Sequence, residues 1–376
     1  MDRVRLGTWQ EIGARVAAAR TAAGLTQQEL ATRLNLHRSA LARIESGQRH
    51  LDALELARLA DALGRTVDWF ISEPPEMIAS HRRARSVDAS VNHLEDQLEM
   101  VARDVTLLVG IGELRPRARA ELGTSLSHVR DAERAAGQVR ESLEVPEGPL
   151  HELQESVERV GLYVFSLDLG PSVIDGGYVR LDSCGVAVVN GRVDPGRRRF
   201  NTAHELGHHL LADEYTTDFA IGSTRQERES LIDAFSIHLL MPRMPVSGRW
   251  ETLHAEGRDD RTALIVIAAE FRVSWSAACS QVRNLELITE HDRRVLDARR
   301  PTRADYLELG VRLGEELAPP AVPVAFVRAV LRAYRRYKIG EGRAIELLRG
   351  TVSVDELPER DELPLHAFRG EFEDLA

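Results

Sequence analysis

Short amphipathic segments follow one another near the start of the chain. In the first, Ile12, Val16 and Ala19 recur at steps of three and four, which predicts a buried helix face. In the second, Thr26 stands before the apolar run and Glu29 follows three residues later, as in a capping box. Similar patterns predict helices at 27–34, 38–46, 54–63 and 66–71. Two brief helices joined by a tight turn inside a small bundle are typical of a helix-turn-helix domain.

A longer apolar stripe follows the boundary marked by Pro74 and Pro75. Five apolar residues fall at alternating steps of four and three, which makes a short heptad-like seam. They are Leu94, Leu98, Val101, Val105 and Leu108. A second helical stretch is predicted over 117–143. Both a dimerisation arm and a packed helical hairpin fit this pattern, and we favour the hairpin because the seam is short.

From Leu150 onward the periodicity changes. A helix at 151–160 is followed by runs of β-branched and apolar residues, with Gly176–Gly177 and Asn190–Gly191 as turns. These runs predict strands at 162–167, 178–181 and 185–190. Helical patterns resume at 197–211, 227–242 and 262–290 and continue through 301–376. The fold class is therefore mainly α with a small β-sheet.

Composition and charge leave the predicted fold class unchanged but narrow the possible partners and the cellular compartment. The chain has 376 residues and a formal net charge of −10, so no global basic field points to nucleic acid. Residues 351–376 hold eight acidic residues against two arginines. The two cysteines, Cys184 and Cys279, are isolated, which excludes a cysteine zinc cluster and indicates a reducing compartment. Because the chain has neither a long apolar run nor a signal peptide, we expect a cytoplasmic, nucleoid-associated protein with no membrane partner.

The helix predicted at 197–211 carries the sequence His204-Glu205-Leu206-Gly207-His208. On a helix, residues four apart lie on one face, so both imidazoles can bind one zinc ion. Glu205 then stands beside the ion as a general base for hydrolysis. Gly207 lowers helix stability by roughly 1 kcal/mol relative to alanine, and its position between two histidines predicts a close packing contact.

The next helical stretch contains two acids four residues apart, Glu229 and Asp233. A catalytic zinc takes three protein ligands and keeps one position open, so Glu229 is a candidate third ligand. Asp233 is a candidate for the hydrogen bond that orients a ligating histidine. Glu227 is the main alternative to Glu229 as the third ligand. Nothing in the sequence singles out a residue that stabilises the oxyanion, although Tyr215 and His238 are available.

The segments RRRFNTAHELGHHLL and ERESLIDAFSIHLLMP resemble the ImmA/IrrE group of zinc metallopeptidases. The resemblance implies a gluzincin-like site in a zincin-like α+β core, with Zn²⁺ bound by His204, His208 and Glu229. Glu205 is then the catalytic residue. The spacing of Glu229 to the LLMP end of the second segment favours it as the third ligand. Asn201 replaces the threonine usual in that group, which changes none of the expected ligands.

The N-terminal pattern GLTQQELATRLNLHRSALARIESGQRHLDALELARLADALG resembles the Xre group of lambda-repressor-like helix-turn-helix domains. The resemblance implies that the helix beginning at Arg38 enters the major groove of double-stranded DNA. The expected contacts are Gln27, His37, Arg38, Ser39 and Arg43. Because single modules bind weakly, a homodimer on a two-fold operator is expected. The alternative is a bundle that only contacts other proteins. Residues 1–80 hold ten arginines and ten acidic residues, so the domain has no net positive charge to attract DNA.

Near the C-terminus, Arg328, Arg332, Arg335 and Arg336 share one predicted helix face, with tyrosines nearby. A basic face with aromatic residues can hold nucleic acid or an acidic partner. More often such a face is solvated or pairs with the protein's own acids, and we favour that interpretation.

Together, the patterns and the resemblances divide the chain into four parts. They are an Xre-type helix-turn-helix domain at 1–73, a helical connector at 74–145, a zinc metallopeptidase domain at 146–298 and a helical C-terminal region with an acidic tail at 299–376. We expect a DNA-binding regulatory zinc metallopeptidase that cleaves a partner protein, a transcriptional repressor or antitoxin, in a stress or phage-related response. Two alternatives stay open. One is a transcription factor whose zincin-like domain senses a ligand without cleavage, and the other is self-cleavage.

Overall fold

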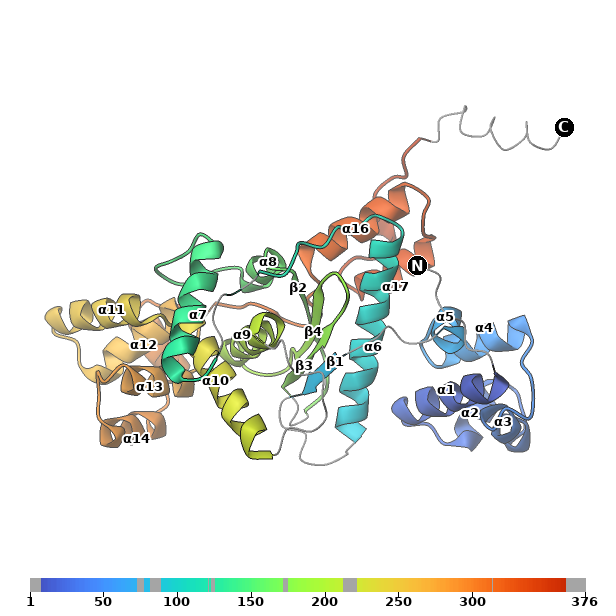
Figure 1. Ribbon diagram of the computed structural model, residues 1–376, viewed down its shortest axis with the longest axis horizontal. Helices are drawn as coiled ribbons and strands as arrows, with labels where there is room; N and C mark the ends of the chain where they lie inside the picture. Colours follow the sequence, from blue (N-terminus) through green and yellow to red (C-terminus); the bar gives the residue numbers. More distant parts are fainter. Residues whose placement is uncertain are drawn as a thin grey trace.

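The computed structural model describes residues 8–72, 78–81, 89–120, 122, 126–171, 175–211, 222–312 and 314–362. Along 78–81, 89–92 and 222–225 only the backbone is described. Figure 1 shows three groups of elements side by side: an N-terminal helical bundle, a central sheet with helices on both faces, and a second helical group at the opposite end. The predicted class, mainly α with a small sheet, is confirmed.

Five helices form the N-terminal bundle around one apolar core. They are α1 (Trp9–Ala22), α2 (Gln27–Arg33), α3 (Arg38–Glu45), α4 (Ala53–Ala62) and α5 (Val67–Ile71). The expected capping box is present, since the Thr26 side chain accepts a hydrogen bond from the backbone amide of Glu29. Asn35, with a φ of 55°, makes the turn between α2 and α3. The two helices and this turn form the predicted helix-turn-helix.

Four strands form one sheet in the order β1-β3-β4-β2. They are β1 (Ile78–His81), β2 (Leu162–Leu167), β3 (Gly176–Arg180) and β4 (Gly185–Asn190). β2 runs parallel to β4, whereas β3 is antiparallel to both β4 and β1. Three of these strands were predicted, and β1 was missed because its four residues carry no alternating pattern. At its outer edge β2 makes one bridge, between Ser166 and Ala321.

Both faces of the sheet are buried. Leu162 and Val164 of β2 belong to one apolar cluster, while Tyr163 and Phe165 belong to the other. Strands buried on both sides read as continuous apolar runs, which is the pattern the sequence has here. The first cluster includes side chains of α7 (Val129–Ser142), α8 (Leu153–Glu158), α9 (Pro195–Leu211) and α10 (Gly222–Leu240), and it continues into the helices that follow α10. The second includes side chains of α6 (Ala89–Gly110), α16 (Val324–Arg335) and α17 (Glu341–Leu348).

The heptad-like seam from Leu94 to Leu108 packs on the sheet and not in the helical hairpin that we expected. The five apolar residues of the seam are at most 1% exposed. Through them, α6 packs against the sheet and against α16. α7, from the second predicted stretch, lies in the other cluster and packs on α10. The helical-hairpin interpretation is therefore wrong, because steps of four and three serve a helix buried on a sheet equally well. The bounds of a connector at 74–145 stay a prediction.

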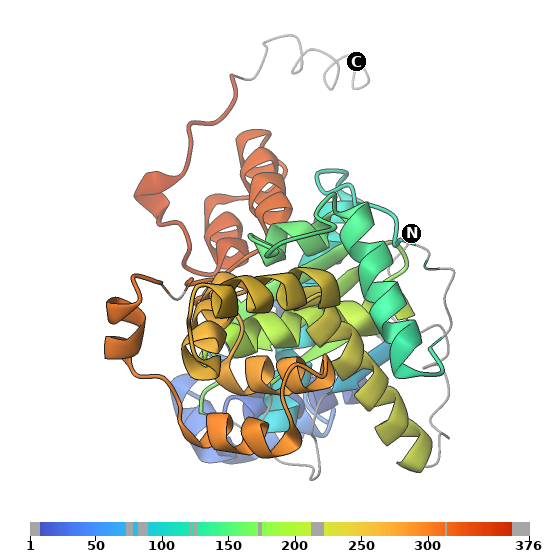
Figure 2. The ribbon, with the colours of Figure 1, turned by 90° about the vertical axis from the view of Figure 1, so that its left-hand side faces the viewer.

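Four helices gather at the end of the molecule opposite the N-terminal bundle, in gold and orange in Figure 1 and Figure 2. They are α11 (Arg243–Ala255), α12 (Asp260–Glu270), α13 (Trp275–Asn284) and α14 (Glu290–Ala298), and they are followed by the short α15 (Arg303–Glu308). Ser274 caps α13 by accepting from the backbone amide of Ala277. Within the described ranges no single helix is long and apolar enough to span a membrane, and α12 with α13 passes that test only as a pair bent by 112°.

The arginine-rich face of α16 pairs with acids of the chain itself. Glu113, whose side chain is 1% exposed, lies within 3.6 Å of Arg332 and Arg336. Arg335 pairs with Asp361 at 3.1 Å. These contacts support intramolecular pairing over a nucleic-acid surface at this face. The rest of the acidic tail, from 363 onward, lies outside the described residues.

Gly207 lies where α9 crosses α10. A Cβ atom at this position would stand 2.7 Å from Cγ2 of Ile232 and 3.2 Å from Cδ1 of Phe235. Both distances are shorter than ordinary van der Waals contact, so the close packing expected at this glycine is confirmed.

Gly207→Ala should therefore destabilise the protein by about 1–3 kcal/mol through overpacking. Gly248→Ala is the matched control, because Gly248 is also helical but exposed, and its Cβ would meet no atom within 4 Å. The higher helix propensity of alanine contributes about 1 kcal/mol at both sites, so their comparison isolates packing. Thermal unfolding should give a lower midpoint for Gly207→Ala than for Gly248→Ala. Equal midpoints would contradict a tight crossing.

Candidate metal centre and DNA-binding surface

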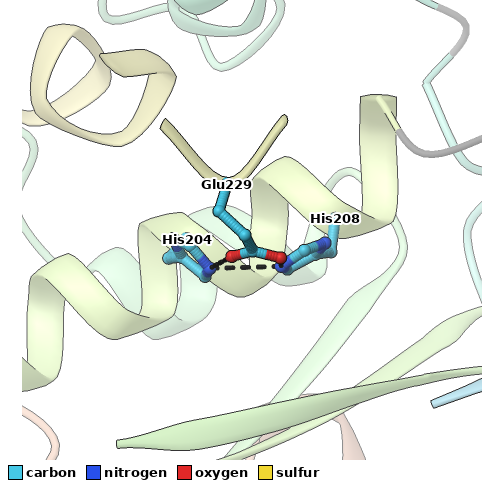
Figure 3. A group of neighbouring side chains, drawn as sticks. All are labelled: His204, His208 and Glu229. Carbon is cyan, nitrogen blue, oxygen red and sulfur yellow. Dashed lines mark hydrogen bonds and ion pairs between the residues drawn. The ribbon is translucent and has the colours of Figure 1, made fainter. Parts of the chain in front are cut away.

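Two helices bring three possible metal ligands together (Figure 3). His204 and His208 lie one turn apart on α9, and Glu229 points toward them from α10. The Nε2 atoms of the two histidines are 3.1 Å apart. The Glu229 carboxylate oxygens lie 3.2 Å from His204 Nε2 and 3.7 Å from His208 Nε2. Both imidazoles are buried, and the Glu229 side chain is 20% exposed, so Glu229 is the most accessible of the three candidate ligands.

The spacing of these donor atoms fits a tetrahedral zinc site. With metal–ligand bonds of about 2.0–2.2 Å, tetrahedral donors stand roughly 3.4 Å apart. The observed separations of 3.1, 3.2 and 3.7 Å lie on both sides of this value. Two imidazoles and one carboxylate are a donor set typical of catalytic zinc, which keeps a fourth position open. The residues present therefore fit a zinc ion.

Asp233 orients one of the two imidazoles. Its Oδ1 atom lies 2.9 Å from Nδ1 of His204. Because an ionised carboxylate only accepts hydrogen bonds, Nδ1 of His204 carries the hydrogen and Nε2 keeps its lone pair. That lone pair is directed toward His208 and Glu229, the neighbours of Nε2.

Glu205 lies on the side of α9 that faces the sheet. It is 2% exposed and four residues before His209, so the two side chains share a helix face. His209 Nε2–H donates to the Val160 carbonyl at 3.1 Å, and Nδ1 accepts from the Tyr178 hydroxyl at 3.0 Å. Burial lowers the pKa of His209 to about 4, so its ring is neutral. Gly185 makes room for this ring, because a Cβ there would lie 2.5 Å from its Nδ1.

A buried arginine fixes the first turns of α9. Arg199 is fully buried, donates to the Leu150 carbonyl at 2.5 Å and pairs with Glu316. Glu316 also pairs with Arg272, from the turn between α12 and α13. Sequence reasoning missed Arg199 and His209 as anchors of the helix. A buried arginine needs a carboxylate partner, but this one lies 117 residues away along the chain.

The remaining sequence candidates lie apart from the donor cluster. Glu227 is exposed and is not part of the donor group. Tyr215 lies outside the described residues. His238 follows Glu229 by nine residues on α10, about 13 Å along the helix axis, which is too far to stabilise an oxyanion at the centre.

The DNA contacts expected from the sequence lie mostly on the surface of the N-terminal bundle. The exposed ones are His37, Arg38, Ser39 and Arg43, at the start and along α3. Gln27 is half-buried, and its amide donates to the Glu45 carboxylate at 2.7 Å, so its side chain is engaged within the bundle. In Figure 1, α3 lies on the side of the bundle away from α6, which leaves it accessible to a ligand.

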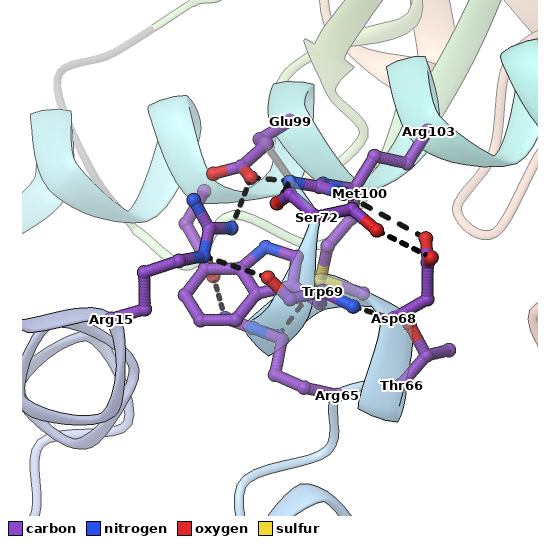
Figure 4. A network of polar contacts seen from close by, with 10 residues as sticks. Arg15, Arg65, Thr66, Asp68, Trp69, Ser72, Glu99, Met100 and Arg103 are labelled. Carbon is purple, nitrogen blue, oxygen red and sulfur yellow. Dashed lines mark hydrogen bonds and ion pairs between the residues drawn. The ribbon is translucent and has the colours of Figure 1, made fainter. Parts of the chain in front are cut away.

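On its other side, the bundle contacts α6 through shielded polar groups (Figure 4). The Arg15 guanidinium lies 3.8 Å from the centre of the Trp69 ring, and its Nε donates to the Trp69 carbonyl at 2.7 Å. Glu99 on α6 accepts from both Arg15 and Arg103, and Arg103 donates to the Ser72 carbonyl. The Arg15 and Glu99 side chains are each 15% exposed. α6 therefore joins the bundle to the sheet that supports α9.

Comparisons with known proteins match two parts of the chain. Residues 16–70 match the family model described as Helix-turn-helix. Residues 157–283 match a peptidase family model described as IrrE N-terminal-like domain, and this range contains all three candidate metal ligands. No curated protein and no solved structure matched the chain. The chain therefore joins an Xre-type helix-turn-helix domain, which supports DNA binding, to an ImmA/IrrE-like domain of a peptidase family.

Proposed function

We propose that this chain is a DNA-binding regulatory zinc metallopeptidase that cleaves a partner protein. The convergence of His204, His208 and Glu229 carries the proposal, together with the buried acid Glu205 that follows His204 directly in the sequence. A zinc site that only stabilises the fold needs no acid next to its ligands, whereas hydrolysis needs a general base there. The resemblance to the ImmA/IrrE group further suggests a transcriptional repressor or antitoxin as substrate, cleaved in a stress or phage-related response.

Each side chain has one task in this mechanism. His204, His208 and Glu229 would hold the ion, and Asp233 keeps the His204 ring oriented. When bound, zinc supplies Lewis acidity, which polarises the scissile carbonyl and acidifies the attacking water. Glu205 accepts the proton of that water and delivers it to the leaving amine. The water oxygen first forms a C–O bond to the carbonyl carbon, and the C–N bond then breaks as the amine takes the proton from Glu205, so water is the only co-reactant.

A transcription factor with a non-proteolytic sensor domain is the second candidate. It is favoured by one observation: α6 contacts the N-terminal bundle with one side and the sheet under the metal centre with the other. A ligand that shifts α9 on the sheet can thereby influence the bundle without any cleavage. The two candidates differ in what Glu205 is needed for.

Removal of a donor should remove the metal. The wild-type chain should hold about one zinc ion, and His208→Ala close to none, because three protein ligands are needed. Asp233→Ala should keep the ligands but weaken zinc affinity about 10–100-fold. His254→Ala is the control, since His254 lies on α11 outside the donor group. Elemental analysis after dialysis measures the stoichiometry. Equal zinc in wild type and His208→Ala would place the ion elsewhere.

Glu205→Gln should retain zinc and lose cleavage by about 10²–10⁴-fold, the usual contribution of a general base. Co-expression with the products of neighbouring genes, followed by gel electrophoresis, measures cleavage, and the chain alone with and without zinc tests self-cleavage. Glu227→Gln changes an exposed acid outside the donor group and should cleave like wild type. Undiminished cleavage by Glu205→Gln contradicts the peptidase mechanism. A regulatory response that persists in this variant favours the sensor.

Arg38→Ala and Arg43→Ala should each weaken binding to the preferred DNA site about 5–150-fold, because a bidentate base contact contributes roughly 1–3 kcal/mol. The site is first selected from a library of genomic fragments, and affinities are then compared at one salt concentration. Arg58→Ala is the control, since Arg58 is an exposed arginine of α4, outside the helix-turn-helix. If all three variants bind like wild type, α3 does not read DNA.

A further inference from the structure

A groove of about 840 Å³ opens beside the candidate metal centre, between α9, α10 and α13. It shares Asp233 with the centre, because the carboxylate that contacts His204 also lines the groove. On α10 the lining continues from Ser230 through Asp233 to Ile237, at helical steps that recede from Glu229. The volume lies in the range of about 300–1,000 Å³ found for ligand sites. The groove is therefore a continuation of the centre along α10.

The polar side chains that α9 contributes to the groove bond to other groups of the protein. Arg197 pairs with Asp175 at 2.7 Å, and the side chain of Asp175 is 4% exposed. The Asn201 amide donates to the Asp175 carbonyl at 3.2 Å. The only acids that line the groove within the described residues are thus Asp175, held by Arg197, and Asp233, held by His204. Arg197 compensates the charge of Asp175, whereas Asp233 keeps its negative charge at the end of the groove nearest the candidate metal centre, away from the rim formed by α13.

His238 offers a fixed hydrogen-bond donor to the groove that it lines. Nε2 of the buried Gln281 lies 2.8 Å from the Met241 carbonyl and 3.3 Å from His238 Nδ1. A carbonyl only accepts, so the atom facing Met241 is the amide nitrogen, and its second hydrogen is donated to His238 Nδ1. Burial lowers the pKa of His238, so the neutral ring carries its hydrogen on Nε2. The Nε2–H group is what this ring can present to a ligand.

One rim of the groove is positively charged. Arg283, at the end of α13, lines it with a side chain that is 49% exposed. Arg283 shares Glu290 with Arg293 and Arg294, at distances of 3.3, 2.8 and 3.2 Å. Hydrogen bonds from Arg293, followed by the charges of both neighbouring arginines, lower the pKa of Glu290 to about 2. Asp297 adds a second carboxylate, 3.8 Å from Arg293. The three guanidinium groups still outnumber the two carboxylates, so Arg283 keeps N–H donors for a ligand.

We propose that this groove binds an acidic, extended segment of the protein substrate, a few residues from the scissile bond. His238 Nε2–H donates to a backbone carbonyl of that segment, and Arg283 pairs with one of its carboxylates. His238 lies about 13 Å from Glu229 along α10, which is the length of roughly four residues of extended chain. This inference rests on the proposed peptidase function, and it adds the charge and the extended form of the substrate.

A binding experiment on the full-length, zinc-loaded Glu205→Gln chain separates the groove from catalysis. The probes are two fluorescein-labelled peptides of equal length, one alternating alanine with glutamate and the other alanine with lysine. Fluorescence anisotropy at physiological ionic strength measures their dissociation constants. The glutamate peptide should bind about tenfold more tightly than the lysine peptide, because carboxylates pair with the rim arginine.

Two added substitutions test the named contacts. Arg283→Glu should weaken the glutamate peptide about tenfold, and His238→Phe, which keeps the ring volume but removes the donor, about fivefold. Arg258→Glu is the matched control, because it makes the same charge change at an arginine that is 38% exposed and outside the groove. It should leave the binding unchanged. Because Arg283 is exposed, Arg283→Glu should stay folded and tests the groove by itself even if His238→Phe unfolds.

Three outcomes would overturn the inference: equal affinity for both peptides, no binding of either, or undiminished binding of the glutamate peptide in Arg283→Glu. Failure of the groove assignment can be distinguished from failure of the proposed peptidase function. If the wild-type chain cleaves a protein with no preference for acidic flanking segments, only the groove assignment is wrong. If the Glu205→Gln chain binds the glutamate peptide as expected while the wild type cleaves nothing, only the peptidase is wrong.

Discussion

The crossing of α9 with α10 is the contact on which the rest of the structure depends. Neither helix can hold an ion alone, because α9 provides two imidazoles and α10 the third donor, Glu229. Gly207 makes the crossing possible, since any larger residue would collide with Ile232. The opposite side of α9 is fixed just as firmly, by His209 on the sheet and by Arg199 in its pair with Glu316. The spacing of the donors is therefore a property of packing as much as of the motif.

The sheet joins this crossing to the rest of the molecule. Its strands are buried on both faces, so that α9 and α10 lie on one side and α6 on the other. α6 also contacts the N-terminal bundle, and α3 lies on the far side of that bundle (Figure 1). The helix-turn-helix and the candidate metal centre are thus at separate places on one framework, and within the described residues neither covers the other. A regulator that engages DNA and a protein partner needs this kind of separation.

Local patterns predicted the parts of this structure that depend on nearby residues. The capping box at Thr26, the bounds of β2 and the close contact at Gly207 follow from spacing, because caps, strand alternation and helix faces are short-range. The seam of α6 was misassigned, since an apolar stripe does not identify what covers it. The ion pair of Arg199 and the amide of Gln281 that fixes His238 were also out of reach, because their partners are distant along the chain.

The most direct test of the central claim is X-ray absorption at the zinc edge of the metal-loaded, full-length protein. A site built at the α9–α10 crossing predicts two imidazole nitrogens and one or two further light ligands at about 2.0–2.2 Å, with no sulfur neighbour. Glu229→Gln should alter the oxygen contribution and leave both imidazoles in place. A sulfur neighbour at about 2.3 Å, or a spectrum without imidazole scattering, would contradict the account and leave the two helices without a metal to hold.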